Sequence, residues 1–312
     1  MSVDLSRLRQ LPRVRRPSGF PWSAPTWPGG VERPPREKKT GAAYDTAWAR
    51  RYPARLARAA LVDWVVKPVT RTVADVSVDG TERLDSLTGP VVFAANHHSH
   101  LDTGVLLGAI PSRFRHRTVV AAAADYFFAN RLGGTAAALV LNAIPIERTK
   151  VNRRSAELTA ELLKDGWSIL IFPEGGRSPD GWGQEFRGGA AYLSVRCGVP
   201  LVPVHLAGTD RILRKGMKRP QPGPVTVRFG NPMRPDDAED ARKFGVRVEA
   251  AVASLADEHT TDSWTARKRA AAGTTPPLSG PTAPKWRRAW ALERRRRLPA
   301  RTRTEAWPWT KP

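Results

Sequence analysis

Cysteine is almost absent from this 312-residue sequence, in which Cys197 is the only one. A single cysteine excludes an intrachain disulfide and gives no indication of an oxidising compartment. Long apolar runs are also missing, since no stretch approaches the roughly 20 apolar residues that a membrane-spanning helix needs. The opening MSVDLSRLRQLPRVRRP lacks the apolar segment of a secretory signal, so we expect no signal peptide.

Acidic residues are few relative to basic ones, but the imbalance is uneven along the chain. The formal net charge is +22, of which residues 1–41 carry +6 and residues 263–312 carry +11. Residues 42–262 carry only +5 and have the composition of an ordinary globular domain. The two ends are rich in Pro, Arg and Trp without sustained hydrophobic periodicity, so we predict that both are disordered or locally helical basic arms.

Two uses of the basic arms are open at this point. They are solvated linkers, or they bind the phosphate groups of lipids or nucleic acids. Tryptophan among arginines is typical of a membrane interface, where indole rings lie at headgroup depth, and it also suits stacking on bases.

Residues 44–69 are predicted to form an amphipathic helix at the start of the domain, although Pro53 limits its first turns. Its apolar side chains recur at helical spacing on one face: Leu56, Ala57, Ala60, Leu61, Trp64 and Val65. This face either docks on the core or lies in a membrane interface.

The rest of the domain alternates short apolar runs with longer helical patterns. Strands are predicted in residues 89–96, 117–124, 139–146, 168–173, 200–208 and 224–230. Helices are predicted in residues 103–110, 125–133, 151–166, 188–198 and 235–258. This alternation indicates a single α/β domain with a mixed, largely parallel central sheet and flanking helices. In such sheets, functional sites form in the loops after the carboxyl ends of strands.

The stretch FAANHHSHLDTG follows the first of these strands and holds three of the six histidines. If Ser99 caps the next helix, Asp102 lies in the first turn, and His97 can fold back over it from the loop. Asp102 would then hold one ring nitrogen of His97 and stabilise the imidazolium. The other nitrogen would be free to take a proton from a hydroxyl group.

A metal site is the alternative interpretation of the same stretch. His98, His100 and Asp102 have the spacing of the metallo-β-lactamase signature, which continues with a histidine where this chain has Thr103. Such a site needs at least three protein ligands. The remaining ligands would have to come from His116, His205 or His259. A third possibility is that the histidines simply occupy a surface turn.

Two further polar segments follow predicted strands and favour the histidine base. Arg148 follows IPI, and Arg177 follows Glu174-Gly175-Gly176. Because strands of one sheet end at a common edge, these segments and the histidine loop are expected to meet there. Two guanidinium groups can clamp a phosphate, and paired glycines allow backbone N–H groups to approach it. The set suggests acyl transfer to a hydroxyl group of a phosphorylated acceptor.

Four motifs in this order resemble those of the glycerolipid acyltransferases, which acylate glycerol-3-phosphate or 1-acylglycerol-3-phosphate. The resemblance covers roughly residues 90–230. It rests on Asn96-His97-x4-Asp102, Ile144-Pro145-Ile146-Glu147-Arg148, Phe172-Pro173-Glu174-Gly175-Gly176-Arg177-Ser178 and Val202-Pro203-Val204, with Phe186-Arg187-Gly188-Gly189-Ala190 after the third motif. The family usually has threonine where this chain has Gly176, which leaves the acceptor lipid open.

The resemblance implies an acyltransferase that moves a fatty acyl group from acyl-CoA or acyl-carrier protein to 1-acyl-sn-glycerol-3-phosphate, giving phosphatidic acid. His97 is then the base and Asp102 its partner, with no metal and no bound cofactor, because the acyl donor is a cosubstrate. The acceptor phosphate is assigned to Arg148, Glu174, Gly175, Gly176 and Arg177, and an apolar donor pocket to Phe186, Val202 and Pro203.

The expected partners are the acyl donor, a lysophospholipid and an anionic membrane surface rather than nucleic acid. The expected location is the cytoplasm, peripherally on the inner face of the cell membrane. Other lysophospholipid or glycolipid acceptors remain as alternatives. So do two other classes: a metal-dependent hydrolase using His98, His100 and Asp102, and a basic-tailed membrane-binding or nucleic-acid-binding protein.

Overall fold

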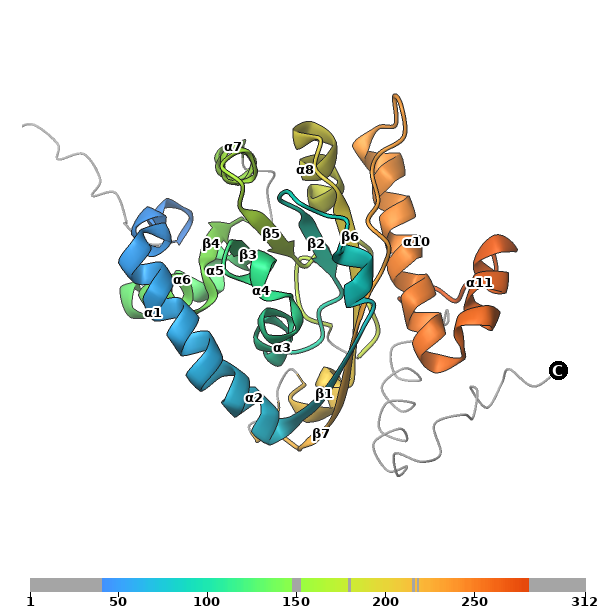
Figure 1. Ribbon diagram of the computed structural model, residues 1–312, viewed down its shortest axis with the longest axis horizontal. Helices are drawn as coiled ribbons and strands as arrows, with labels where there is room; N and C mark the ends of the chain where they lie inside the picture. The colour runs from blue at the N-terminus through green and yellow to red at the C-terminus, as the bar shows by residue number, and fades with distance from the viewer. Residues whose placement is uncertain (1–40, 148–152, 179–180, 215–216, 218, 281–312) are drawn as a thin grey trace, which may run out of the picture. The chain divides into compact units, whose positions relative to one another are not determined.

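A single mixed sheet organises the domain. The computed structural model describes residues 41–147, 153–178, 181–214, 217 and 219–280. Its strands lie in the order β1-β7-β6-β2-β5-β3-β4 (Figure 1). All neighbouring strands are parallel except β6 and β7, which confirms the predicted fold class. The strands are β1 Ala74–Asp79, β2 Val92–Ala95, β3 Thr118–Ala123, β4 Ala143–Ile146, β5 Ser168–Ile171, β6 Leu201–Ala207 and β7 Gly223–Phe229.

Strand β2 occupies the middle of the sheet and is buried on both faces. Phe93 and Ala95 belong to one hydrophobic core, whereas Val92 and Ala94 belong to the other. A strand covered on both faces has no polar alternation, which explains the continuous apolar run in the sequence. Just beyond β2, the Asn96 side chain donates to Leu206 O (2.9 Å) and accepts from Leu206 N–H (2.7 Å), so it extends the pairing with β6.

Helices cover the two faces of the sheet (Figure 1). One core contains side chains of α3 (Leu101–Ala109), including Val105 and Leu106. The opposite core contains side chains of three helices, α7 (Arg153–Lys164), α8 (Gly189–Cys197) and α10 (Ala241–Thr260). The remaining short helices are α4 (Ser112–Arg115), α5 (Ala124–Phe127), α6 (Arg131–Leu141) and α9 (Thr209–Ile212), with 3₁₀ turns at Gly41–Ala43, Ala47–Arg50 and Thr81–Leu84.

The amphipathic helix forms, but its first turns differ from the prediction. It begins at Tyr52 with Pro53 in its first turn, and α1 (Tyr52–Leu61) continues through a π-helical turn (Val62–Val66) into α2 (Lys67–Val73). Residues 44–51 contain a 3₁₀ turn instead, because proline favours the start of a helix over its interior.

The predicted apolar face of this helix points away from the core. Leu56 and Trp64 are 54% and 81% exposed, and Val65 and Val69 are exposed beside them. The opposite side of the helix is buried, at Arg58, Val62 and Thr70. Docking on the core through the apolar face is therefore wrong. No helix in the described ranges has the length and hydropathy to cross a membrane.

Two other element boundaries differ from the predictions. Residues 139–141, predicted as strand, complete helix α6, which starts beyond the Asn130 cap and continues through Gly133 and Gly134. Strand β1 was not predicted, although Ala74, Val76 and Val78 alternate with polar residues in it.

The tail from residue 263, predicted to be disordered or locally helical, is helical in its first part. Ser263–Ala271 form helix α11, with Asp262 at its N-cap accepting from the N–H groups of Trp264 and Thr265 (both 2.9 Å). A capped helix with a packing partner is stable despite low hydrophobicity. Most of the two arms, residues 1–40 and 281–312, lies outside the described residues.

Candidate active site

Polar loops from neighbouring strands meet at the carboxyl edge of the sheet. His97 follows β2, Tyr126 follows β3, and Arg177 follows β5. In the sheet, β5 lies between β2 and β3 and is parallel to both. The first and third motifs therefore lie at one edge, as their positions after strands predicted. Arg148, from the second motif, lies outside the described residues.

His97 and Asp102 are in direct contact. His97 Nδ1 lies 2.8 Å from Asp102 Oδ2, and the imidazole is 18% exposed whereas the carboxylate is fully buried. The same oxygen accepts from the backbone N–H groups of His98 (2.6 Å) and Ser99 (2.8 Å). Helix α3 begins at Leu101, so Asp102 bonds back to the preceding turn much as a capping residue does.

Asp102 carries a negative charge in this setting. Burial opposes its ionisation, but the hydrogen bond from His97 and the neighbouring histidines and Ser99 N–H outweigh burial and lower its pKa. A carboxylate that accepts from Nδ1 fixes that nitrogen as the donor and leaves Nε2 as the proton acceptor. The Phe172 ring stacks on the imidazole, with centroids 4.1 Å apart and planes at 22°.

Glu174 holds the backbone of the histidine loop. Its Oε1 accepts from His97 N–H (2.8 Å), and its Oε2 accepts from Gln184 N–H (2.9 Å). Ser178 N–H donates to His97 O (2.9 Å), so the two loops are joined on both sides of His97. Glu174 is 2% exposed. The structure thus places it beneath His97, whereas the sequence analysis placed it on the acceptor phosphate.

The Glu174 carboxyl titrates far from its ordinary range. Burial raises its pKa to about 7, although the backbone N–H groups of His97 and Gln184 lower it. The nearby acids Asp102 and Glu249 raise it further. Glu174 is therefore partly protonated near neutral pH.

The two glycines of the third motif support the loop in different ways. Gly175 has a φ of +69°, and a Cβ at this position would lie 2.9 Å from Arg187 Nε. Any other residue would be strained there and would displace the Arg187 side chain. Gly176 contributes its carbonyl oxygen, which accepts from Gln184 Nε2 (3.1 Å).

Arg177 belongs to an aromatic and basic group beside His97. Its Cζ lies 5.9 Å from the centre of the Tyr126 ring, on which the His100 ring also stacks with centroids 5.4 Å apart. Tyr126 Oη is 3.0 Å from His100 Nε2. Burial, followed by the charges of Arg177 and His97, lowers the pKa of His100 and favours its neutral form.

The residues predicted to form an apolar donor pocket lie in the core. Val202 and Pro203 are buried within β6, and Pro203 O accepts from Gly230 N–H (2.8 Å). Phe186 packs against the core that α8 and α10 share, and its N–H donates to Glu249 Oε2 (3.2 Å). Their roles are thus in packing.

The ligand set of the metal hypothesis is not brought together. His100 pairs with Tyr126, and the Asp102 oxygen nearest the histidines is occupied by His97 and two backbone N–H groups. Within the described ranges, no group of three His, Cys, Asp or Glu side chains is placed to hold a metal ion. His205 and His259 lie near each other, with ring centroids 6.0 Å apart, rather than with His98.

Sequence reasoning missed three residues of this site. Phe172 stacks on His97, Tyr126 lies between His100 and Arg177, and Gln184 joins Glu174 to Gly176. Phe172 and Tyr126 follow strands β5 and β3, and this position after a strand was the sequence feature that could have identified them as site residues. Gln184 lies in an irregular loop, where neither periodicity nor spacing indicated it.

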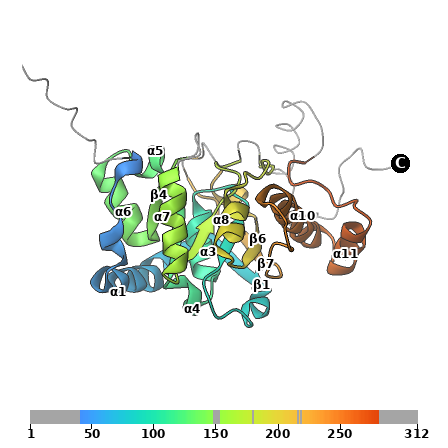
Figure 2. The same ribbon diagram turned by 90° about the horizontal axis from the view of Figure 1, so that it is seen from above.

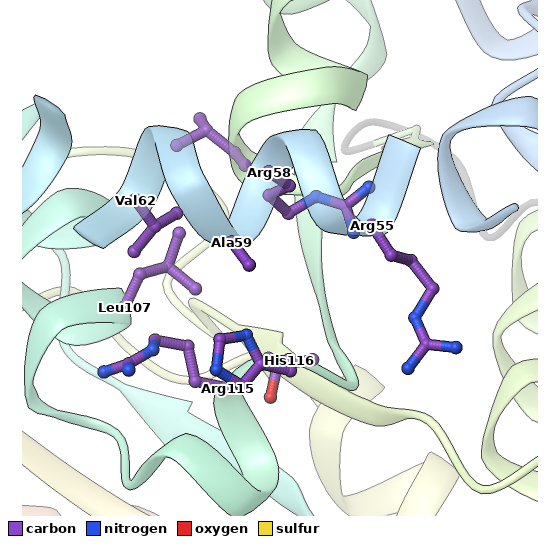
Figure 3. Close-up of a pocket in the computed structure, with 9 residues that line it drawn as sticks. Arg55, Arg58, Ala59, Val62, Leu107, Arg115 and His116 are labelled. Atoms are coloured by element: carbon purple, nitrogen blue, oxygen red, sulfur yellow. The ribbon is translucent and has the colours of Figure 1, made fainter. Parts of the chain in front are cut away.

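A small cavity at the opposite edge of the sheet is separate from this site (Figure 3). Thr118, in its lining, begins β3, whereas Tyr126 follows that strand. Figure 3 shows Val62 and Leu107 facing each other at one end of the cavity, while Arg55 extends away from the helix at the other. The cavity lies beneath α1, and its charged lining is Arg55, Arg58, Arg115 and His116.

Comparison with known proteins finds similar acyltransferases. A family model described as Acyltransferase matches residues 75–207. A chloroplastic 1-acyl-sn-glycerol-3-phosphate acyltransferase of Arabidopsis thaliana is 33% identical over 144 residues, covering 45% of this chain and 38% of that protein. One from Chlamydomonas reinhardtii is 31% identical over 189 residues, covering 59% and 54%. The chain therefore spans about two fifths to about half of the length of these curated relatives.

A solved structure is similar over a larger part of the chain. It is the 1-acyl-sn-glycerophosphate acyltransferase PlsC of Thermotoga maritima, with a TM-score of 0.53 and 26% identity. The similarity covers 69% of this chain and 83% of that one.

Proposed function

We propose that this protein is a glycerolipid acyltransferase that acylates 1-acyl-sn-glycerol-3-phosphate to phosphatidic acid. The Acyltransferase family model that matches residues 75–207 supports the proposal. The acyl group comes from acyl-CoA or acyl-carrier protein, which acts as a cosubstrate. The observation that carries the proposal is the contact between partly exposed His97 and fully buried Asp102 (2.8 Å). The relatives from Arabidopsis and Chlamydomonas and the PlsC enzyme support this choice of acceptor.

The reaction uses His97 as a general base and then as a general acid. Nε2 removes the proton from the acceptor hydroxyl as its oxygen attacks the thioester carbonyl carbon. The tetrahedral intermediate collapses, the carbon–sulfur bond breaks, and the leaving thiolate takes the proton back from Nε2. Asp102 holds Nδ1–H and stabilises the transient imidazolium, much as the carboxylate of a catalytic triad does.

Arg177 binds the acceptor phosphate in this proposal, with Arg148 as its partner from the second motif. A guanidinium group forms charge-assisted hydrogen bonds with phosphate oxygens. Arg177 lies over the ring of Tyr126, and Tyr126 in turn contacts His100, so the guanidinium is held close to the His97 loop. Glu174 acts differently from our initial assignment, because it positions the His97 backbone rather than the acceptor.

The direct test is an assay of thiol release with purified full-length protein. Acyl-CoA and acyl-carrier protein are each supplied with 1-acylglycerol-3-phosphate, with other lysophospholipids and with a glycolipid acceptor. We expect the phosphorylated acceptor to be used best, and His97→Ala to remove the activity. Wild-type turnover by His97→Ala would overturn the mechanism, and preference for an unphosphorylated acceptor would overturn the acceptor assignment.

The protein acts at an anionic membrane surface, on the cytoplasmic inner face of the cell membrane. The exposed apolar side chains of α1, the π-helical turn and α2, among them Leu56, Trp64 and Val69, support this proposal. The net charge of the two arms supports it as well. An apolar helix face inserts at the headgroup boundary, and each basic residue near anionic lipid contributes about 1 kcal/mol.

Vesicle co-sedimentation separates these two contributions. Trp64→Glu should weaken binding to all vesicles, whereas Trp264→Glu, an exposed tryptophan of α11, serves as the matched control. Deleting residues 281–312 should weaken binding to anionic vesicles and its salt dependence, while activity on detergent-dispersed lysolipid persists. If the deletion instead abolishes a DNA mobility shift at matched salt and leaves vesicle binding intact, the arm binds nucleic acid.

A further inference from the structure

The chain beyond the matched region returns to the candidate active site. Helix α11 lies beside α10 (Figure 2), and Arg269 Nη1 pairs with Asp257 at 2.7 Å. Asp257 is buried, so this ion pair is shielded on one side. Residues 272–280 then leave α11 and reach the loop that follows the third motif.

Residues 277–280 meet that loop at two close contacts. Gly183 N–H donates to Leu278 O (3.0 Å), and a Cβ on Gly183 would lie 2.9 Å from Leu278 Cβ. Gly280 lies against the Trp182 ring, where an added Cβ would come within 2.4 Å of Cδ2. Gly280 also has a φ of +72°. Both contacts thus depend on glycine.

The residue next to these contacts reaches the catalytic pair. Gln184 N–H donates to Glu174 Oε2 (2.9 Å), and Gln184 Nε2 donates to Gly176 O (3.1 Å). The other oxygen of Glu174 accepts from His97 N–H (2.8 Å). Trp182 and Gly183 therefore contact residues 277–280, and the next residue, Gln184, bonds to Glu174, which holds the backbone of His97.

We propose that residues 277–280 form a strap that positions the His97 loop through residues 182–184 and Glu174. Gly280 of the strap and Trp182 of the loop are the positioning residues. The loop from 172 to 187 contains no helix or strand among its described residues, so it depends on such contacts for its order. Irregular segments with few contacts open at low free energy, and a misplacement of about 1 Å in an active site can cost roughly a hundredfold in rate.

The activity part of this inference rests on the proposed function, but the structural part does not. The test compares Gly280→Ala with Gly273→Ala in the full chain. Gly273 has a similar φ of +67° but nothing within 4 Å of an added Cβ, so both variants strain the backbone and only Gly280→Ala displaces Trp182. Amide hydrogen exchange is measured without substrate. The values of kcat and KM are then measured with the acyl donor and the acceptor.

We expect Gly280→Ala to speed exchange in residues 172–187 and at His97, and to leave α7 and α10 protected. Its kcat should fall roughly tenfold to a hundredfold, with KM values changed much less, while Gly273→Ala behaves as wild type. Trp182→Ala should reproduce these effects and Trp182→Phe should restore most of kcat, because phenylalanine keeps an aromatic ring against Gly280. If Gly280→Ala does not fold, the comparison of Trp182→Ala with Trp182→Phe still tests whether the strap positions the His97 loop.

Equal exchange and kcat in Gly280→Ala and Gly273→Ala would overturn the strap. So would a uniform rise of exchange through α7 and α10, because residues 277–280 would then support the whole fold rather than the loop. If wild type releases no thiol with any acceptor, the proposed function fails, while the exchange comparison still decides whether the strap orders the loop.

Discussion

Charged side chains are buried at both edges of the sheet, but their hydrogen-bond partners differ between the two edges. At the carboxyl edge, Asp102 and Glu174 accept from the His97 side chain and from backbone N–H groups. At the amino edge, Arg58 donates from Nε to Leu139 O (3.0 Å) and from Nη2 to Ala49 O. Burial, with the charges of Arg50 and Arg55, lowers the Arg58 pKa to about 10.

The difference shows that burial of charge alone does not identify a functional site. The hydrogen bonds of Arg58 end on backbone carbonyls, so they join α1 to α6 and to the turn before α1. The hydrogen bonds of Asp102 end on an imidazole that keeps part of its surface exposed. Only the second arrangement leaves a nitrogen that can exchange a proton with a substrate.

The largest expected effect comes from removing the catalytic pair. His97→Ala and Asp102→Ala should each lower kcat by roughly 10²–10⁴, the range for loss of general acid–base catalysis. His98→Ala and His100→Ala should lower it far less, because neither imidazole is the base. Steady-state thiol release measures all four variants. Loss of activity in excess EDTA, together with loss on His98 or His100 substitution, would favour the metal hypothesis instead.

At the opposite edge, Arg58→Met should affect stability rather than chemistry. Its removal leaves the carbonyl oxygens of Leu139 and Ala49 without this donor, at about 1–3 kcal/mol each. Urea unfolding should therefore show a loss of about 2–6 kcal/mol. Exposed Arg113, paired with Asp85, gives the control Arg113→Met, for which we expect little change. A kcat loss in the folded Arg58 variant as large as that of His97→Ala would break the distinction between the two edges.

Glu174 makes the stability of the carboxyl edge depend on pH. Its folded pKa of about 7 lies above the ordinary 4.5, so the folded state binds the proton more tightly than the unfolded state. The contribution of this proton is full below about pH 4.5 and is lost as pH rises through 7, by roughly 3 kcal/mol at about 1.4 kcal/mol per pKa unit.

Glu174→Gln provides the comparison for this pH dependence. Glutamine stays neutral, so the free energy of unfolding of the wild type should fall relative to that of the variant as pH rises from 4.5 to 7. Urea midpoints measured at intervals across that window give this difference. Parallel pH curves for the two proteins would show that Glu174 has an ordinary pKa in the folded state.

The smallest expected effect concerns the acceptor phosphate. Arg177→Ala removes a charge-assisted contact worth about 1.5–3 kcal/mol, so the acceptor KM should rise roughly tenfold to a hundredfold. The KM for the acyl donor should change much less. Arg113→Ala, on a distant surface, is the control. If Arg177→Ala weakens phosphorylated and unphosphorylated acceptors equally, the phosphate assignment is wrong.

Local sequence patterns predicted most strands of this protein and the position of its candidate site. The apolar runs of β2 and β5 predicted buried strands, and strand ends placed the first and third motifs at one edge. The spacing of His97 and Asp102 across a helix start predicted that their side chains can meet. These features follow from short-range geometry, because strand direction and helix capping are decided within a few residues.

Only the tertiary structure decided how the elements face one another. Periodicity identified an apolar face on residues 52–73, but the packing of Arg58 and Val62 turned that face outward. The sequence motif assigned Glu174 to the acceptor phosphate, whereas in the structure its two oxygens accept from the N–H groups of His97 and Gln184. Residues 277–280 showed no link to the site, since contacts between segments about a hundred residues apart leave no local pattern. The sequence by itself thus determined most strands of the sheet and the pairing of His97 with Asp102, whereas burial and long-range packing decided what surrounds them.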